Sequence, residues 1–457
     1  MFSKVVVANR GAVACRVLRA LKNLGIRSVA VYSEADQDMP HVRWADESYF
    51  IGPSDPHASY LNQDALLNVV KLSGADGVHP GYGFLSENAE FARRVNDSGA
   101  CFIGPSPRWI EAMGHKTRAR ELMAAYGMPM AASSGILDMN PANMIAEASR
   151  LGYPVLVKPA GGGGGIGMLA AHDDAQLLRA VSQSRSLAQR SFGNAELYLE
   201  RLVERPRHVE FQILADRYGN VRHLYERDCS VQRRHQKVIE EAGAPGIPRP
   251  QLDAAAAVMT GALGELGYDV IGTVETLYDS AGSFNFLEMN TRLQVEHAVT
   301  EEVTGVDLVV AQVRLAWGES LDKVLPPSIA IRGHAIEARI YAEDPVRFFP
   351  SPGVLKTLRF PQHMGIRLET GYVEGARVTT HYDPMIAKLI AGGATRNEAI
   401  HRLVVALDET VIEGVKTNIP FIRNVLESPE FSAGEVHTGL GPMILAREKA
   451  TMRERAS

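Results

Sequence analysis

One segment of the sequence, residues 287–296, concentrates polar side chains that could do chemistry. Because side chains alternate along extended backbone, five of them would share one strand face. They are Glu288, Asn290, Arg292, Gln294 and Glu296. Carboxylates and amides can hold a hard cation, and a guanidinium can hold an oxyanion. The pattern predicts a cation site beside an anion site, although a solvated strand face would alternate in the same way.

A glycine run follows the short apolar segment that ends in Lys158. Residues 161–165 are all glycine. Glycine lets the backbone approach a ligand closely and turn its N–H groups toward phosphate oxygens. We therefore expect Gly163, Gly164 and Gly165 to cover the phosphates of a bound ligand. The alternative is a flexible linker, which would usually contain Ser or Pro too. The run is neither a P-loop nor a Rossmann fingerprint, because the glycine and lysine spacings of those motifs are missing.

A second charged cluster occupies residues 232–237. Read as one strand, Arg233, His235 and Lys237 would share one phase, and Gln232 would lie in the other. If the protein encloses both faces of that strand, these side chains could bind an anion. An exposed edge strand protected by charge would show the same pattern.

Length and composition limit the class of protein. A chain of 457 residues is expected to form two to four domains. The net charge of −5 argues against a general nucleic-acid binder. Three distant cysteines indicate reduced thiols in a cytoplasmic protein. No apolar stretch approaches the roughly 20 residues of a membrane span, and the apolar run at residues 5–8 is too short for a signal peptide.

The first hundred residues alternate between predicted strands and helices. Strands are expected at residues 4–8, 28–32, 77–79 and 100–103, with helices near residues 62–72 and 87–97. This alternation predicts an α/β fold with a doubly wound parallel sheet, which binds ligands at the carboxyl ends of its strands. Asn9, Arg10 and the loop after His79 lie at such ends.

Prolines at positions 105 and 107 mark the first domain boundary. We expect an N-terminal domain over residues 1–114, a helical linker over 115–130, a small second domain over 131–203 and a larger mixed α/β body over 204–449. The last residues of the chain are charged and are expected to fray.

Four long motifs give the chain a resemblance to a known family. They are HPGYGFLSEN at residues 79–88, ERDCSVQRRHQK at 226–237, EMNTRLQVEH at 288–297 and YDPMIAKL at 382–389. With them, almost the whole chain resembles the biotin carboxylase component of biotin-dependent carboxylases such as acetyl-CoA carboxylase, which has the ATP-grasp fold. The resemblance implies that ATP phosphorylates bicarbonate to carboxyphosphate. Carbon dioxide released from it would be captured by the deprotonated N1 of biotin on a separate carrier protein.

The resemblance also implies a role for each polar cluster. The residues expected to bind ATP are Lys116, Lys158, Gly163, Gly164, Gly165, Glu200, Arg201, Val203, His208, Gln232 and His235. The residues expected to hold Mg²⁺ or Mn²⁺ are Glu275, Glu288 and Asn290. The expected bicarbonate cradle consists of Lys237, Arg292, Gln294 and the backbone of Val295. Glu296 is the expected base, Arg339 would stabilise the biotin enolate, and Tyr82 would help to seat biotin.

Partners follow from what the sequence lacks. No Ala-Met-Lys-Met biotinyl motif and no carboxyltransferase region occurs, so we expect a subunit that works with a biotin carboxyl carrier protein and a carboxyltransferase. The resemblance alone implies a homodimer. The final carboxyl acceptor is left open, because the transferase would bind it.

Four positions depart from the usual family pattern: Ala12, Ile166, Thr276 and Ala298. None of them carries an assigned chemical role, and together they indicate a divergent paralogue.

Two other functions stay open at this point. A biotin-independent ATP-grasp ligase, which activates a carboxylate as an acyl phosphate, would share the nucleotide machinery. Lys237, Arg292, Gln294, Glu296 and Arg339 favour bicarbonate and biotin over that alternative. A non-catalytic regulatory protein descended from a carboxylase is the third possibility, and the intact polar set argues against it.

Overall fold

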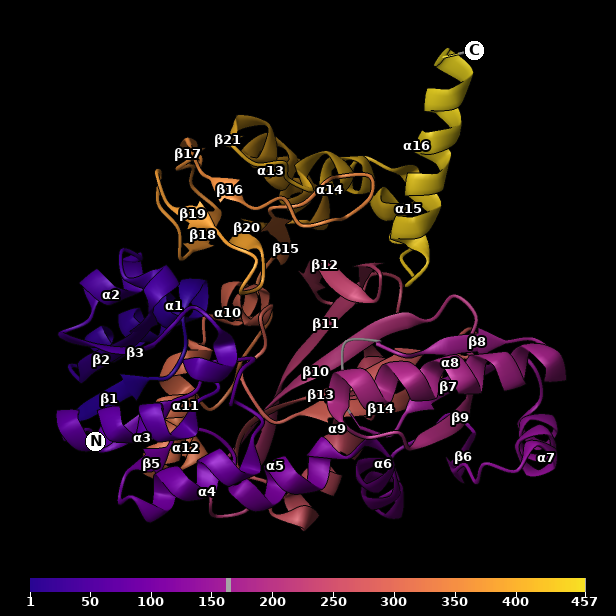
Figure 1. Ribbon diagram of the computed structural model, residues 1–457, viewed down its shortest axis with the longest axis horizontal. Coiled ribbons are helices and arrows are strands. Elements are labelled where there is room, and N and C mark those ends of the chain that lie inside the picture. Colours follow the sequence, from indigo (N-terminus) through magenta and orange to yellow (C-terminus); the bar gives the residue numbers. More distant parts are fainter. Residues whose placement is uncertain (162–165, 457) are drawn as a thin grey trace.

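The computed structural model describes residues 1–161 and 166–456 (Figure 1). Its N-terminal part is a five-stranded sheet in the order β3-β2-β1-β4-β5, and every neighbouring pair is parallel. The strands are β1 (Lys4–Val7), β2 (Arg27–Ser33), β3 (Glu47–Gly52), β4 (Gly77–His79) and β5 (Cys101–Phe102). The predicted doubly wound parallel sheet is confirmed, and β3 is a strand that the pattern did not predict.

Helices cover both faces of this sheet because its central strand is apolar on both sides. They are α1 (Gly11–Asn23), α3 (Gln63–Ser73) and α4 (Ala89–Asp97), with the short α2 (Pro40–Trp44) beside them. Val5 and Val7 pack in the same core as α1, whereas Val6 and Ala8 pack in the core with α3 and α4. This two-sided burial is typical of parallel sheets.

Two helices lead from the first sheet to a small second unit. They are α5 (Pro107–Gly114) and α6 (Lys116–Ala125). The small unit is a four-stranded sheet in the order β6-β9-β7-β8. It contains β6 (Ser133–Ile136), α7 (Pro141–Leu151), β7 (Val155–Pro159), β8 (Leu169–Ala171), α8 (Asp174–Phe192) and β9 (Leu197–Arg201). Its helices and strands share a hydrophobic core of their own, and the unit lies at the lower right of Figure 1.

The largest sheet has eight strands in the order β14-β13-β10-β11-β12-β15-β20-β18, and all of its pairs are antiparallel. The strands are β10 (Arg207–Ala215), β11 (Val221–Arg233), β12 (Gln236–Ala242), β13 (Val270–Tyr278), β14 (Phe284–Asn290), β15 (His334–Tyr341), β18 (Ile366–Thr370) and β20 (Met385–Gly393). Glu210, Glu275 and Glu288 are register partners across β10, β13 and β14. Because register partners point to the same face, the sheet gathers these carboxylates from distant parts of the sequence.

Further helices and short strands complete the body. The helices are α9 (Arg249–Leu266), α10 (His297–Thr304), α11 (Leu308–Trp317), α12 (Leu321–Val324), α13 (Arg396–Glu409), α14 (Ile419–Leu426), α15 (Pro429–Ser432) and α16 (Leu440–Ala456). The short strands are β16 (Gly353–Val354), β17 (Thr357–Arg359), β19 (Arg377–Val378) and β21 (Val411–Glu413). Among the described helices, none has both the length and the apolar character needed to cross a bilayer.

The expectation that residues 287–296 form one strand was wrong. Strand β14 ends at Asn290, and α10 begins at His297. The backbone N–H of Thr291 donates to Oε1 of Glu87 at 3.2 Å instead of continuing the ladder with β13. The polar residues after Asn290 therefore lie on a loop, and tertiary contacts decide where they point.

The expectation that residues 232–237 form one strand was also wrong. They form a hairpin in which β11 ends at Arg233 and β12 begins at Gln236. Arg234 and His235, the two turn residues, have φ values of 48° and 63°. Two successive residues with positive φ are typical of the tight turns that match strand twist. His235 and Lys237 therefore belong to a turn and a strand rather than to one strand face.

The separate core of the small unit predicts a local effect of a core mutation. Leu177 is fully buried in that core, so Leu177→Ala is expected to cost about 2–5 kcal/mol through lost burial and a residual cavity. Hydrogen exchange should then show weaker protection in β7 and β9, with β10 and β13 unchanged. Leu178→Ala is the matched control, because Leu178 is 36% exposed. Equal loss of protection in β10 and β13 would contradict a separate unit.

Candidate active site

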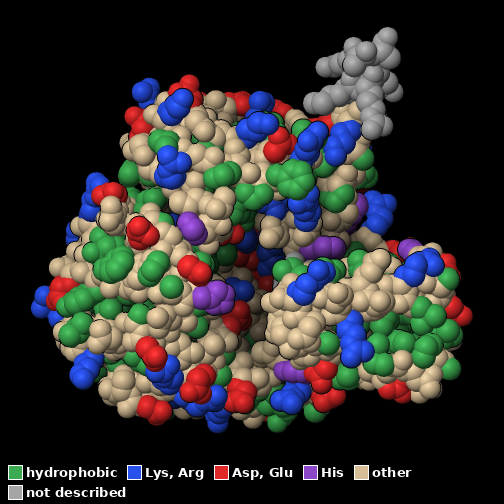
Figure 2. Space-filling model, viewed as in Figure 1, with side chains coloured by type: hydrophobic (Ala, Val, Ile, Leu, Met, Phe, Trp, Pro, Cys, Tyr) green, Lys and Arg blue, Asp and Glu red, His purple; other side chains and the backbone are tan. Residues whose placement is uncertain are grey.

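A cavity of about 750 Å³ opens between the N-terminal sheet, the small unit and the large sheet. Figure 2 shows the surface hollowed there, with charged side chains inside. Every described residue with a predicted site role lines this cavity: Tyr82, Lys116, Lys158, Glu200, Arg201, Val203, His208, Gln232, His235, Lys237, Glu275, Glu288, Asn290, Arg292, Gln294, Val295, Glu296 and Arg339. Gly163, Gly164 and Gly165 lie outside the described residues.

Lys237 lies at the centre of the polar part of the cavity. Its Nζ is 2.5 Å from Glu210, 2.7 Å from Glu275 and 2.8 Å from Glu296. An ammonium group has three N–H donors, so each donor has one carboxylate partner. Burial lowers the pKa of Lys237, but the three carboxylates outweigh it and hold that pKa well above its usual value.

Glu210 is a site residue to which the sequence interpretation gave no role. It is completely buried, and Nε of Arg227 lies 2.6 Å from its Oε1 while Lys237 holds Oε2. Arg227 is itself buried and donates to Gln212 and Thr300, both at 2.9 Å. Burial and the nearby Glu296 raise the pKa of Glu210. Its position two residues after His208, in an otherwise apolar run, was the sequence signal that could have identified it.

Glu296 connects two cations at the end of the loop after β14. Its Oε1 contacts Lys237, and its Oε2 accepts a hydrogen bond of 2.8 Å from Arg339. Burial raises the pKa of Glu296, but Lys237 and Arg339 outweigh it and hold that pKa well below its usual value. The carboxylate is therefore ionised and able to accept a proton. Its position, rather than its basicity, would make it a general base.

The guanidinium of Arg292 is held on three sides. Nε donates to Glu87 at 2.9 Å, one terminal nitrogen donates to Asn290 at 2.8 Å, and the other donates to Gln294 at 3.0 Å. Glu87 belongs to the N-terminal part of the chain and was not assigned a role. It fixes both Arg292 and the backbone of Thr291, so the loop depends on a domain far away in the sequence.

Glu275, Glu288 and Asn290 form an oxygen-rich group on β13 and β14. Glu275 and Glu288 are register partners, and the amide of Asn290 donates to Glu275 at 2.8 Å. Burial raises the pKa of Glu275, but Lys237 and His208 outweigh it and hold that pKa well below its usual value. Carboxylates with an amide oxygen fit Mg²⁺ or Mn²⁺, which prefer hard oxygen ligands.

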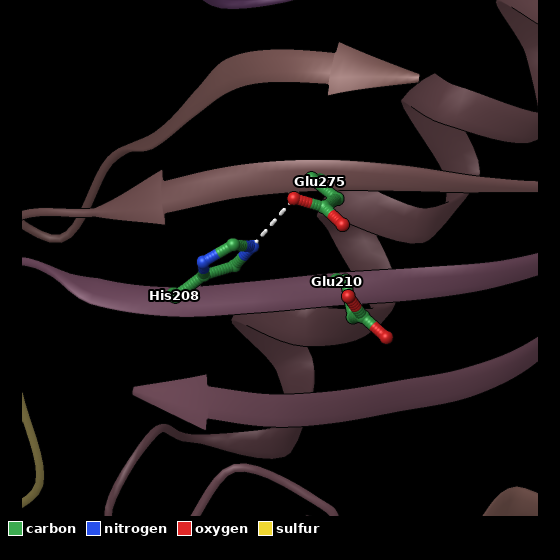
Figure 3. A group of neighbouring side chains, drawn as sticks. All are labelled: His208, Glu210 and Glu275. Atoms are coloured by element: carbon green, nitrogen blue, oxygen red, sulfur yellow. Dashed lines mark ion pairs between the residues drawn. The ribbon is translucent and has the colours of Figure 1, made fainter. Parts of the chain in front are cut away.

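A second group of ligand-type side chains lies beside the first and shares Glu275. Figure 3 shows His208 and Glu210 on one strand and Glu275 on the next, with Nε2 of His208 2.8 Å from Glu275. The ammonium of Lys237 bridges Glu210 and Glu275, so a metal ion there would have to displace it. Cations also lie beside the group of Glu275, Glu288 and Asn290, because Nζ of Lys116 is 3.2 Å from Glu288 and Arg292 donates to Asn290 at 2.8 Å.

Two lysines lie at the other end of the cavity. Nζ of Lys158 is 3.1 Å from Glu200, which also contacts Arg120 at 3.1 Å, and Nζ of Lys116 is 3.2 Å from Glu288. Apolar side chains also line this cavity: Leu156, Met168, Leu202, Leu277 and Leu287. Cations beside an apolar wall suit a ligand with phosphates and a flat ring.

Tyr82 lies in an aromatic end of the cavity, which is also lined by Phe84 and Tyr382. The side chain of Asn9 holds the Tyr82 loop by donating to the carbonyls of Pro80 and Tyr82, at 2.7 and 2.8 Å. The sequence placed Asn9 and the loop after His79 at the ends of neighbouring strands, and β1 and β4 are indeed paired.

The four departures from the family pattern lie in different surroundings. Ala12 lines the cavity, and Ile166 is 47% exposed. Ala298 is buried, and the hydroxyl of Thr276 donates to the carbonyl of Val209 at 2.6 Å. None of the four takes a polar contact away from Lys237, Glu296 or Arg339.

Known proteins share this organisation. Residues 1–110 match the biotin carboxylase N-terminal domain, residues 115–324 the ATP-binding domain of the carbamoyl-phosphate synthase L chain, and residues 337–440 the biotin carboxylase C-terminal domain. The biotin carboxylase of Halalkalibacterium halodurans is 49% identical over 96% of this chain and 97% of its own length. Biotin carboxylase 2 of Bacillus subtilis is 47% identical over 96% of this chain and 98% of its own length.

Solved structures agree in fold. The biotin carboxylase domain dimer of Hydrogenobacter thermophilus 2-oxoglutarate carboxylase, in complex with MgADP, ADP and bicarbonate, has a TM-score of 0.93 and 42% identity, covering 97% of this chain and 99% of that one. A biotin carboxylase–β-γ-ATP complex from Campylobacter jejuni has a TM-score of 0.94 and 39% identity, covering 98% and 99%. By its sequence and its fold, the chain belongs to the biotin carboxylase family.

Proposed function

We propose that this protein is a biotin carboxylase that uses ATP and bicarbonate to carboxylate biotin on a separate carrier protein, through carboxyphosphate. One observation carries the proposal: Lys237, Arg292 and the Glu296–Arg339 pair line the same cavity as the lysines near its apolar wall. Cations and a base for a small oxyanion thus adjoin a nucleotide-sized space. The bicarbonate and MgADP bound by the Hydrogenobacter relative support the same ligands here.

The nucleotide would occupy the end of the cavity that contains Lys116 and Lys158. Their ammonium groups would neutralise phosphate oxygens, with Gly163, Gly164 and Gly165 as phosphate cover. Glu200, Arg201 and Val203 would face the adenine side, and His208, Gln232 and His235 would add polar contacts. Glu275, Glu288 and Asn290 would hold Mg²⁺ or Mn²⁺, which when bound supplies charge neutralisation at the phosphates.

Bicarbonate would bind between Lys237, Arg292, Gln294 and the backbone of Val295. Glu296 accepts the proton of bicarbonate as an oxygen of that anion attacks the γ-phosphorus of ATP. The bond from γ-phosphorus to the bridging oxygen breaks, and ADP leaves. Lys237 and Arg292 stabilise the charge that develops in this step, because they are held in place before it begins.

Biotin would bind beside Tyr82, close to Arg339. Carboxyphosphate breaks down to carbon dioxide and phosphate, the released phosphate takes the proton of biotin N1, and a bond forms between N1 and carbon dioxide. The guanidinium of Arg339 would stabilise the negative charge of the biotin enolate, and Glu296 holds that guanidinium in place. A carrier protein and a carboxyltransferase would be the partners, and a homodimer is supported by the dimer of the relative.

We also propose the domain division of residues 1–114, 115–130, 131–203 and 204–449, with residues 131–203 acting as a lid over the nucleotide. The separate core of that unit supports this division. A lid would exclude water from the phosphates.

Phosphate release from MgATP tests the reaction directly. Release should require bicarbonate and should rise strongly when free biotin is added, because both substrates take part in the reaction. Release that depends on bicarbonate but ignores biotin would favour a biotin-independent ATP-grasp ligase. Absence of release under every condition would favour a non-catalytic protein.

Replacing the bicarbonate cradle should separate chemistry from nucleotide binding. Arg292→Ala and Lys237→Ala are expected to lower bicarbonate-dependent ATP hydrolysis by about 100-fold or more, since each removes a preorganised cation. Nucleotide affinity by calorimetry should stay within about threefold. Lys71→Ala is the matched control, because Lys71 is exposed on α3.

Thermal unfolding of each variant checks for misfolding, since removing Lys237 leaves three carboxylates without their shared partner. Loss of nucleotide binding in a folded Arg292→Ala protein would contradict the assignment of Arg292 to bicarbonate.

The lid predicts a nucleotide-dependent change in hydrogen exchange. A MgATP analogue should increase amide protection within residues 131–203 and leave the N-terminal sheet unchanged, because only the lid would close on the phosphates. Lys158→Ala should remove most of this increase. Equal protection of the lid with and without nucleotide would contradict the proposal.

A further inference from the structure

Arg339 lies in a row of buried charges that crosses four neighbouring strands. Glu240 of β12 is the register partner of Glu337 of β15, Arg339 of β15 is the partner of Lys388 of β20, and Lys388 is the partner of Glu369 of β18. Register partners point to one face of a sheet, as do residues two apart on a strand, so all five share one face. At most 8% of each is exposed to solvent.

Glu240 and Glu296 contact different nitrogens of the Arg339 guanidinium. Oε1 of Glu240 lies 2.5 Å from Nε of Arg339, whose terminal nitrogen donates to Glu296. The contact with Nε lacks hydrogen-bond alignment, and neither oxygen of Glu240 accepts a hydrogen bond from the described residues. Glu240 is also absent from the residues that line the cavity. It therefore touches Arg339 but not the space for substrate.

Glu337, the register partner of Glu240, also has a carboxylate oxygen that accepts no hydrogen bond from the described residues. Its Oε2 is 3.3 Å from Nζ of Lys388, while its Oε1 accepts no hydrogen bond from the part of the chain that the structure describes. Two ionised carboxylates opposite each other in a buried sheet repel, and one bound proton relieves that repulsion. Both residues have oxygens without a hydrogen-bond donor among the described residues, and these oxygens can carry the proton.

Burial, with the surrounding charges, brings the pKa values of Glu240 and Glu337 near neutral pH. Burial raises the pKa of Glu240 to about 8, with Glu337 and Glu296 adding to the rise and Arg339 and Lys237 opposing it. Burial raises the pKa of Glu337 to about 7, with Lys388 and Arg339 opposing the rise and Glu369 and Glu296 adding to it.

We propose that Glu240 and Glu337 share one proton and together position Arg339, so that the grip on its guanidinium changes when the pair gains or loses that proton. Glu240 is a positioning residue, because it acts through Arg339. Ionised Glu240 attracts Nε and keeps the guanidinium directed at Glu296, whereas protonated Glu240 loses that attraction. This inference rests on the proposed function, in which Arg339 stabilises the biotin enolate.

The sign of the pH response follows from this contact. The competent form has Glu240 ionised, so biotin stimulation should rise as pH increases through the ionisation of the pair. Stimulation means the ratio of phosphate release with biotin to release without it, at equal bicarbonate. The ratio removes pH effects on bicarbonate and on ATP hydrolysis that are common to both reactions.

Two isosteric variants should change this ratio in different ways. Glu337→Gln removes the charge opposite Glu240, which lowers the pKa of Glu240, so the rise should move to lower pH by about one unit. Glu240→Gln should lower the ratio about tenfold and abolish its rise with pH. A residue with a merely structural role would lower stability without moving the pH profile.

Glu241→Gln is the matched control. Glu241 is the next residue, is equally buried, and contacts Nε2 of His334 at 2.8 Å and Nε of Arg396 at 2.7 Å on the other side of β12. Its variant should keep the pH profile of wild type. If Glu240→Gln does not fold, Glu240→Asp replaces it, and this shorter acid should keep the rise with pH at a reduced ratio.

Each result decides between the two proposals. A wild-type protein whose phosphate release ignores biotin overturns the proposed function and, with it, any role for the pair. A wild-type protein that responds to biotin, with Glu337→Gln and Glu240→Gln profiles unmoved along the pH axis, overturns the positioning pair alone. A shift of Glu337→Gln to higher pH also overturns it, because removing a neighbouring negative charge cannot raise the pKa of Glu240.

Discussion

The contact of one ammonium with three carboxylates is the constraint on which the rest of the site depends. Lys237 holds Glu210, Glu275 and Glu296 together in a buried region. Like charges so close would repel strongly without a cation between them. Arg227 donates to the second oxygen of Glu210, and Arg339 donates to the second oxygen of Glu296. Cations and carboxylates therefore alternate through the site, and each group holds its neighbours in place.

The large antiparallel sheet makes this lattice possible. Glu210 and Glu275 come from adjacent strands in register, and Lys237 reaches them from a third strand. The loop that carries Arg292 and Glu296 makes no strand pairing, so side chains from other parts of the chain hold it in place. Glu87 supplies this support from the N-terminal domain, which couples the two domains at the point where chemistry would occur.

The sequence predicted the parallel N-terminal sheet well, because strands with apolar residues on both sides alternate there with amphipathic helices. The family resemblance named most of the polar residues that line the cavity, but it gave no role to Tyr341, Tyr372 or Thr438. Local patterns failed at residues 232–237 and 287–296. Alternation predicted a strand in each segment. The first contains a turn with positive φ values, and the second contains a loop that Glu87 holds in place.

By itself the sequence determined the fold class, the family resemblance and the chemical types of the site residues, because these depend on local periodicity and on motifs. Only the tertiary structure decided which of these residues meet. Sheet register brought Glu210 into the site and set Glu240 opposite Glu337 beneath Arg339. Register depends on pairings between strands far apart in the chain, and periodicity within any one strand carries no information about them.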